Sequence, residues 1–171
     1  MRLDTTKGEL LSFLSKKKII FKVPQLNFYS YGDWSKNKKS IVKQIQNKYK
    51  KKLVALRSSA SDEDSILNSN AGKYKTFLNV NCRNKTISKK IDEIFKSYKK
   101  YRPINKQDMF IVQEMVGDLS MSGVVFTKDL ETGSNYYVIN YDDVSGFSDS
   151  VTSGKGELSN RVLYIQKLMT K

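Results

Sequence analysis

The amino-acid sequence predicts an α+β protein, with helices early in the chain and a mainly antiparallel sheet late. Two segments carry apolar residues at helical intervals of three and four, and several short runs rich in Val, Ile, Phe and Tyr are separated by turn-forming residues. Hydrophobic residues make up 39% of the 171 residues and aromatic residues 11%, which is enough for a core. This length fits one compact domain or a large piece of a longer protein.

The early part of the chain is expected to contain two helices and an extended segment. Thr6 can cap the first helix, Glu9 completes a capping box, and the helix is expected to run to about Lys18. An extended segment is expected over residues 19–24, and a second helix over residues 38–52. The apolar stripe of the second helix consists of Ile41, Val42, Ile45 and Tyr49, with lysines on the opposite face.

The later part is expected to consist of strands around one further helix. Strands are expected over residues 53–59, 74–80, 109–116, 122–127 and 136–141, with a Ser/Gly-rich segment over 146–156 and an apolar stretch around 162–168. The helix is expected over residues 86–101, and its apolar side consists of Ile87, Ile91, Ile94, Phe95, Tyr98 and Tyr101.

The basic charge is concentrated in one part of the chain. Lys and Arg number 31 against 17 Asp and Glu, and the net charge is +14. Residues 1–110 hold 26 basic and 9 acidic residues, whereas residues 111–171 hold 5 and 8. Because 26 of the basic residues are Lys, and base readout and phosphate clamping favour Arg, nucleic-acid binding is not expected from charge alone. The asymmetry still suggests that the N-terminal part meets something anionic.

Missing residue types exclude several kinds of chemistry. The chain has no histidine and one cysteine, Cys82, so it cannot by itself form a His-based triad, a phosphohistidine carrier, an internal disulfide or a Cys-cluster zinc site. No apolar run approaches the ~18–20 residues of a membrane span, and the N-terminus lacks the apolar stretch of a signal peptide. A cytoplasmic location is therefore expected.

The segment over residues 54–80 is the one most suggestive of a binding site. Arg57 leaves a predicted strand into Ser58, Ser59 and Ala60, and a small-residue loop over residues 69–73 leads to the next strand. Such loops can present successive N–H groups to an anion, and a nearby cation can clamp a bound phosphate. Ser/Gly loops are also common as simple turns, so spacing alone leaves both interpretations open.

Longer motifs resemble a known family. VALRSSASDED (54–64), followed in register by NAGKYKTFLNV (70–80), and IVQEMVGDLSMSGVVFTKDLETG (111–133) match the motifs of the nucleotide-binding domain of phosphoenolpyruvate synthase and pyruvate phosphate dikinase. Thr6-Lys7-Gly8 lies where that family has an early Gly-Lys-Gly element. The resemblance implies that residues 1–171 form a single incomplete ATP-grasp region, the N-terminal portion of that fold. Its helix-rich basic part would span 1–105, and its β-hairpin part, lining adenine and ribose, 106–171.

The resemblance also implies roles for individual residues. Lys7 would reach the nucleotide phosphates, and Arg57 would clamp them as the expected catalytic residue. The loop that covers the phosphates would consist of Asn70, Ala71, Gly72 and Lys73, with Thr76. The segment that lines adenine, and whose backbone reads the base edge, would consist of Gln113, Glu114, Met115 and Val116. Asp149 would replace the glutamate that the family uses near the ribose.

Each of these residues also has a purely structural explanation. Lys7 fits an exposed lysine in a first helical turn, and Arg57 fits a salt bridge as well as a ligand contact. Gln113 and Glu114 fit the alternation of a half-buried strand. The acidic run 62–64 fits charge at a helix N-terminus better than metal ligation, so no metal site is expected within the chain.

By the same resemblance, the chain is expected to be the ATP-binding part of an ATP-dependent phosphotransferase. In the full enzyme ATP would phosphorylate a carrier histidine on another domain, for transfer to a small acceptor such as pyruvate or glutamine. Mg²⁺ is an expected cofactor, with ligands beyond the end of this chain, as are the phosphohistidine and acceptor domains. The chain alone is expected to bind ATP weakly and to be inactive.

Two alternatives remain open. Residues 141–146 depart from true synthases and dikinases, and they look closer to divergent relatives such as the glutamine kinase of capsule phosphoramidate biosynthesis. The lysine excess also fits a non-catalytic module that binds a nucleotide or a polyanion.

Overall fold

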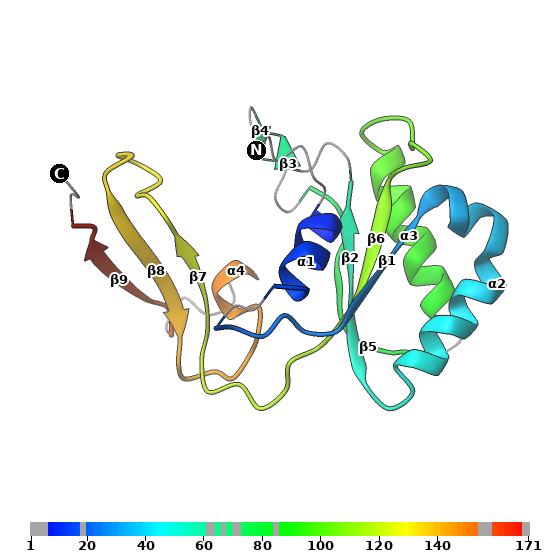
Figure 1. Ribbon diagram of the computed structural model, residues 1–171, viewed down its shortest axis with the longest axis horizontal. Coiled ribbons are helices and arrows are strands. Elements are labelled where there is room, and N and C mark those ends of the chain that lie inside the picture. Colours follow the sequence, from blue (N-terminus) through cyan, green and yellow to red (C-terminus); the bar gives the residue numbers. More distant parts are fainter. Residues whose placement is uncertain are drawn as a thin grey trace. The chain divides into compact units, whose positions relative to one another are not determined.

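The computed structural model describes residues 7–17, 20–60, 64–65, 68–69, 73–83, 86–153 and 159–168 (Figure 1). The chain divides into two compact units, Met1–Met115 and Val116–Lys171. The α+β class is confirmed, and the strand pairs of the described residues are all antiparallel. The three long helices lie before residue 100, as expected, but strands are interspersed with them, so the expectation that the sheet comes late in the chain is wrong.

A four-stranded sheet organises the first unit. Its order is β1 (Leu26–Ser30), β6 (Met109–Glu114), β2 (Leu53–Ser59) and β5 (Phe77–Asn81). Strand β6 is the most apolar of these and pairs on both sides, with β1 and with β2. The division expected at residue 105 would separate this strand from the first unit, whereas the structure places the boundary after Met115.

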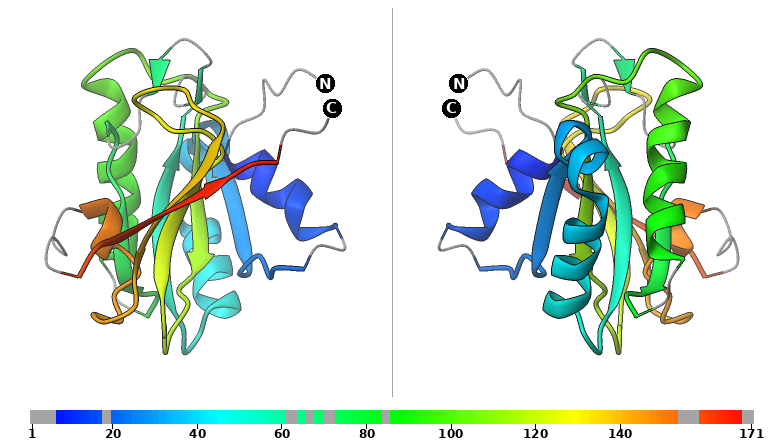
Figure 2. Two further views of the ribbon diagram at one scale, coloured as in Figure 1. Left: turned by 90° about the vertical axis from the view of Figure 1, so that its left-hand side faces the viewer. Right: turned by 90° about the vertical axis from the view of Figure 1, so that its right-hand side faces the viewer.

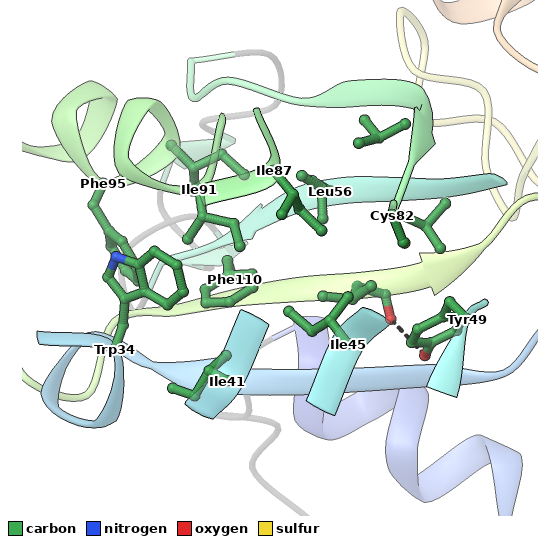
Figure 3. Close-up of a cluster of buried hydrophobic side chains, with 14 of the residues drawn as sticks. Trp34, Ile41, Ile45, Tyr49, Leu56, Cys82, Ile87, Ile91, Phe95 and Phe110 are labelled. Carbon is green, nitrogen blue, oxygen red and sulfur yellow. Dashed lines mark hydrogen bonds between the residues drawn. The ribbon is translucent and has the colours of Figure 1, made fainter. Parts of the chain in front are cut away.

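Two helices cover one face of this sheet, and the first helix lies on the other. The helices α2 (Tyr31–Lys48) and α3 (Ile87–Lys99) lie side by side over one face (Figure 2). Helix α1 (Lys7–Ser15) lies on the opposite side (Figure 1). The core lies under α2 and α3 (Figure 3), and its largest fully buried side chains are Trp34, Ile45, Tyr49, Leu56, Ile87, Ile91, Ile94, Tyr98, Phe110 and Val112.

The second helix begins seven residues earlier than expected. Ser30 caps α2, because its hydroxyl oxygen accepts a hydrogen bond from the N–H of Asp33 at 3.0 Å. Asn37 has non-helical dihedral angles, so a local kink lies within α2. The extended segment expected over 19–24 is no strand in its described part; β1 follows it.

The other early predictions agree with the structure more closely. Strand β2 has the expected bounds, and α3 has the expected apolar side apart from Tyr101, which follows the helix and is half-exposed. The short strands β3 (Asp64–Ser65) and β4 (Asn68–Ser69) pair with each other. Asp64 therefore belongs to a strand, and the explanation of a helix N-terminus is wrong for this residue; Asp62 and Glu63 lie outside the described residues.

The second unit contains a three-stranded sheet in the order β7 (Ser122–Phe126), β8 (Tyr136–Asp142), β9 (Arg161–Gln166). The short helix α4 (Ser150–Ser153) contacts β7 and β8. Every residue of β9 is exposed, whereas Val138 and Asp142 of the central strand β8 are buried. None of the helices in the described ranges is long and apolar enough to cross a membrane.

We predict that Asp142 makes the second unit sensitive to acid. Its carboxylate accepts hydrogen bonds from the hydroxyl and N–H of Ser145 and from the N–H of Val144, and these hold its pKa well below the usual 3.8. Because the pKa is lower in the folded state, this stabilisation is complete above the usual pKa and is lost as the pH falls toward the folded-state pKa.

Urea unfolding followed by circular dichroism between about pH 6 and pH 3 tests this point. Asp142→Asn should unfold at lower urea than the wild type at pH 6, with a smaller further loss on acidification. The control is Asp143→Asn, which removes an exposed ion pair with Arg161 and should change stability little. Equal acid sensitivity of Asp142→Asn and the wild type would contradict the assignment.

Candidate functional site

The start of α1 is fixed to the sheet at one residue. Gly8 is the buried residue of the helix, and its N–H donates a hydrogen bond to the Ser59 hydroxyl oxygen at 3.1 Å. A methyl group at Gly8 would lie 3.5 Å from Phe28 Cβ and 3.6 Å from Ile111 Cγ1, so this turn packs directly on β1 and β6. Lys7, the preceding residue, therefore begins α1 above the sheet face that α2 and α3 leave uncovered.

Arg57 lies on the same face of the sheet. It pairs with Ile111, which contacts the Gly8 position, and directly opposed residues of antiparallel strands share a face. The Arg57 guanidinium donates a hydrogen bond from Nη1 to the side-chain oxygen of Gln113 at 3.3 Å. It forms no ion pair with any residue that the structure describes. The salt-bridge explanation for Arg57 thus finds no partner in this part of the chain.

The segment over residues 113–116 divides between the two sheet faces. Gln113 faces Arg57, whereas Glu114 points to the other face and forms an ion pair with Lys52 at 2.7 Å. The side-chain alternation considered for Gln113 and Glu114 is therefore present. The side chain of Glu114 therefore stabilises the fold through this ion pair. Any part that Glu114 has in a binding site must come from its backbone groups.

Backbone hydrogen bonds of this segment show which of its N–H groups remain available to a ligand. The N–H of Glu114 donates to the Gln25 carbonyl at 2.9 Å, and that of Met115 donates to the Leu53 carbonyl at 3.0 Å. The N–H of Val116 makes no hydrogen bond to the described part of the chain, and the Val116 side chain is half-exposed. Val116 thus offers the first unused donor after β6, at the point where the chain passes from one unit to the other.

Only part of the predicted phosphate loop can be placed. Asn70, Ala71 and Gly72 lie outside the described residues. Thr76 is exposed and directly precedes β5, whose first residue Phe77 pairs with Leu56, next to Arg57. The Lys73 amine lies 4.9 Å from the ring centre of Tyr101, an attractive cation–π arrangement.

Asp149 lies in the second unit, immediately before α4. Its carbonyl oxygen accepts a hydrogen bond from the N–H of Thr152 at 3.1 Å, so the residue closes the first turn of this short helix. Its side chain is partly exposed. Asp149 and Val116 both belong to the second unit.

Comparison with known proteins identifies the family to which this chain belongs. A family model described as the pyruvate phosphate dikinase AMP/ATP-binding domain matches residues 33–168. This chain belongs to that family. The prodigiosin synthesizing transferase PigC of Serratia marcescens is 32% identical over 110 residues, which are 60% of this chain and 12% of PigC. The chain thus corresponds to a small fraction of that relative.

The pyruvate phosphate dikinase match covers only some of the predicted site residues. It begins at residue 33, so it includes Arg57, the adenine segment and Asp149, but not Lys7. The expectation for Lys7 depends instead on the resemblance of Thr6-Lys7-Gly8 to the family's Gly-Lys-Gly element. A shallow pocket of about 370 Å³ lies between α1 and residues 23–28, and none of the predicted site residues lines it.

Two neighbours of the site were not predicted as functional residues. The N–H of Ser59 donates to the Tyr98 hydroxyl oxygen at 2.9 Å, and that hydroxyl donates to the Met109 carbonyl at 2.6 Å. Ser59 was visible in the sequence only as part of the R-S-S-A motif, and Tyr98 only as an apolar helix position. Their connection depends on contacts between α3, β2 and β6, which no local pattern reveals.

Metal ligation receives no support in the described ranges. No group of three or more His, Cys, Asp or Glu residues lies close enough there to hold an ion. Cys82 is buried, and burial raises the pKa of its thiol to about 11, so it remains protonated at neutral pH.

We predict that the Tyr98 hydroxyl stabilises the end of β2. Tyr98→Phe leaves the N–H of Ser59 and the carbonyl of Met109 buried without this partner, so the free energy of unfolding should fall by about 1–3 kcal/mol. Urea unfolding measures the change. Tyr101→Phe is the matched control, since Tyr101 is half-exposed and should lose almost nothing. A similar loss in both variants would refute the role of this hydroxyl.

Proposed function

We propose that this chain is the ATP-binding part of an ATP-dependent phosphotransferase, with the N-terminal portion of an ATP-grasp fold. Membership of the pyruvate phosphate dikinase AMP/ATP-binding family supports ATP as the ligand. The observation that carries the proposal is the position of the Arg57 guanidinium. Its partly buried guanidinium lies on the sheet face that also holds the start of α1, and it has no carboxylate partner in the described ranges.

The phosphate end of the nucleotide is assigned to Lys7 and Arg57. Phosphoryl transfer requires fixed positive charge near the transferring group, because negative charge spreads over its oxygens in the transition state. A guanidinium can bind two phosphate oxygens at once, and Gln113 limits the rotation of Arg57 by accepting one of its hydrogen bonds. Lys73 and Thr76, with the loop 70–72, would cover the phosphates from β5.

The adenine end is assigned to the backbone over residues 114–116. An adenine edge offers one N–H donor and one ring-nitrogen acceptor, and a backbone segment can match both. The N–H of Val116 would serve as the donor, and the carbonyl of Glu114 as the acceptor, since a carbonyl oxygen has two lone pairs. Met115 would contribute apolar contact, and Asp149 would accept hydrogen bonds from ribose hydroxyls.

The wider reaction would need groups that this sequence does not supply. With no histidine in the chain, the carrier histidine would belong to another domain, and its phosphoryl group would pass to a small acceptor such as pyruvate or glutamine. The name of PigC gives a transferase with another product, so the family name does not fix the acceptor. Mg²⁺ would offset phosphate charge, but no ligand cluster for it exists in the described ranges.

We predict that Arg57→Ala weakens ATP binding about 10- to 100-fold, because a charge-assisted hydrogen bond contributes about 1.5–3 kcal/mol. A shift titration by NMR measures the affinity even when binding is weak. The matched control is Arg83→Ala, which removes an exposed arginine that bonds the Lys50 carbonyl. ATP affinity that is unchanged in Arg57→Ala would contradict the phosphate role of Arg57.

A second function is favoured by the lysine-rich helices. Helix α2 carries a row of exposed lysines with few acidic neighbours, and these lysines include Lys36, Lys39, Lys43 and Lys48. Such a row is better suited to binding a polyanion than a single nucleotide. Titration with ATP and with duplex DNA at two salt concentrations separates the two functions. Selective ATP binding supports the phosphotransferase, whereas DNA binding that falls steeply with salt, without nucleotide preference, supports the polyanion module.

A further inference from the structure

The first turn of helix α1 is attached to the sheet at Gly8. Two of its large apolar side chains are substantially exposed, Leu10 at 38% and Phe13 at 46%. Gly8 is its buried residue, and its last residue, Ser15, is exposed. The contacts of Gly8 therefore fix the first turn of α1 on the sheet, while the other two leucines of the helix are half-buried.

Those contacts combine a hydrogen bond with a close fit. The buried Ser59 hydroxyl accepts the N–H of Gly8 at 3.1 Å, and this N–H belongs to the first turn of the helix, where no carbonyl of the helix is available to it. A methyl group at Gly8 would meet its neighbours at ordinary contact distance, so a larger side chain would lift the turn from the sheet.

Ser59 and Arg57 occupy one strand and one face. They are two residues apart on β2, so their Cα atoms are separated by about 7 Å, and alternation places both side chains on the α1 side. Ser59 is itself fixed by the Tyr98 hydroxyl, which accepts its N–H at 2.9 Å. Strand β2 therefore carries Arg57 itself. It also holds the backbone next to Lys7, because the Ser59 hydroxyl binds the N–H of Gly8.

We propose that Ser59 is a positioning residue of the nucleotide site: its hydroxyl holds the first turn of α1 so that Lys7 and Arg57 contact the phosphates of one nucleotide. The inference rests on the proposed function. Coupling between two binding events is reciprocal, so phosphates held by Lys7 would in turn stabilise the docking of α1 on the sheet.

If Ser59 positions Lys7, it should affect the binding of the phosphates and not the binding of the nucleoside. ATP uses Lys7, whereas adenosine has no phosphate and does not. Loss of the Ser59 hydroxyl should therefore weaken ATP binding while leaving adenosine binding nearly unchanged. A general loss of structure would weaken the binding of ATP and of adenosine alike. The comparison of the two affinities therefore separates a positioning role from a merely structural one.

The test is a double-mutant cycle in the 171-residue chain, with ATP and adenosine affinities measured by NMR shift titration. Ser59→Ala should weaken ATP binding about tenfold and adenosine binding less than about twofold. In the Lys7→Met background, Ser59→Ala should cause no further loss. Ser15→Ala is the control, since this exposed hydroxyl on the same helix donates to the Ser12 carbonyl and to no other group in the described ranges. If Ser59→Ala does not fold, Gly8→Leu displaces the same turn by bulk and should give the same pattern.

Each outcome has a distinct meaning. Full ATP affinity in folded Ser59→Ala, or an equal loss in the presence and absence of the Lys7 amine, overturns the positioning role while the proposed function stands. No ATP binding by the wild type overturns the proposed function, and the inference fails with it. Amide hydrogen exchange gives a second readout: ATP should slow exchange in residues 8–15 of the wild type but not of Ser59→Ala.

Discussion

The burial of strand β6 at the centre of the first sheet is the constraint on which the rest of that unit depends. Phe110, Ile111 and Val112 are fully buried, and the strand pairs with β1 on one side and β2 on the other. Each face of the strand therefore needs its own cover. Helices α2 and α3 provide it over Phe110 and Val112, and the first turn of α1 provides it over Ile111.

The two faces of this sheet consequently have different chemistry. Under α2 and α3 the side chains form a continuous apolar core, which stabilises the unit by removing apolar surface from water. The face toward α1 carries Arg57, Gln113 and Ser59, and the buried Gly8 of α1 packs against it. Arg57 is only partly buried on this face, so its guanidinium can be accessible to a ligand, while the rigid core behind it holds that group in place.

Individual residues show how far sequence patterns reach. Periodicity predicted the apolar side of α3, because a helix that packs on a sheet needs one apolar face. It missed the start of α2, because the first two turns of this helix contain few apolar residues. In the adenine segment, alternation allowed Glu114 to be either a ligand or a surface residue. The ion pair with Lys52, which follows α2, assigns its side chain to the fold.

The sequence by itself determined the α+β class, the lack of histidine chemistry and the family motifs around Arg57. These properties depend on residue identity and short-range spacing, which a linear pattern contains. The tertiary structure alone decided that Gly8 meets Ser59, that Gln113 holds Arg57 and that β6 belongs with the first unit. Each of these contacts joins residues about fifty or more positions apart in the chain, and only the packing of strands against one another brings them together.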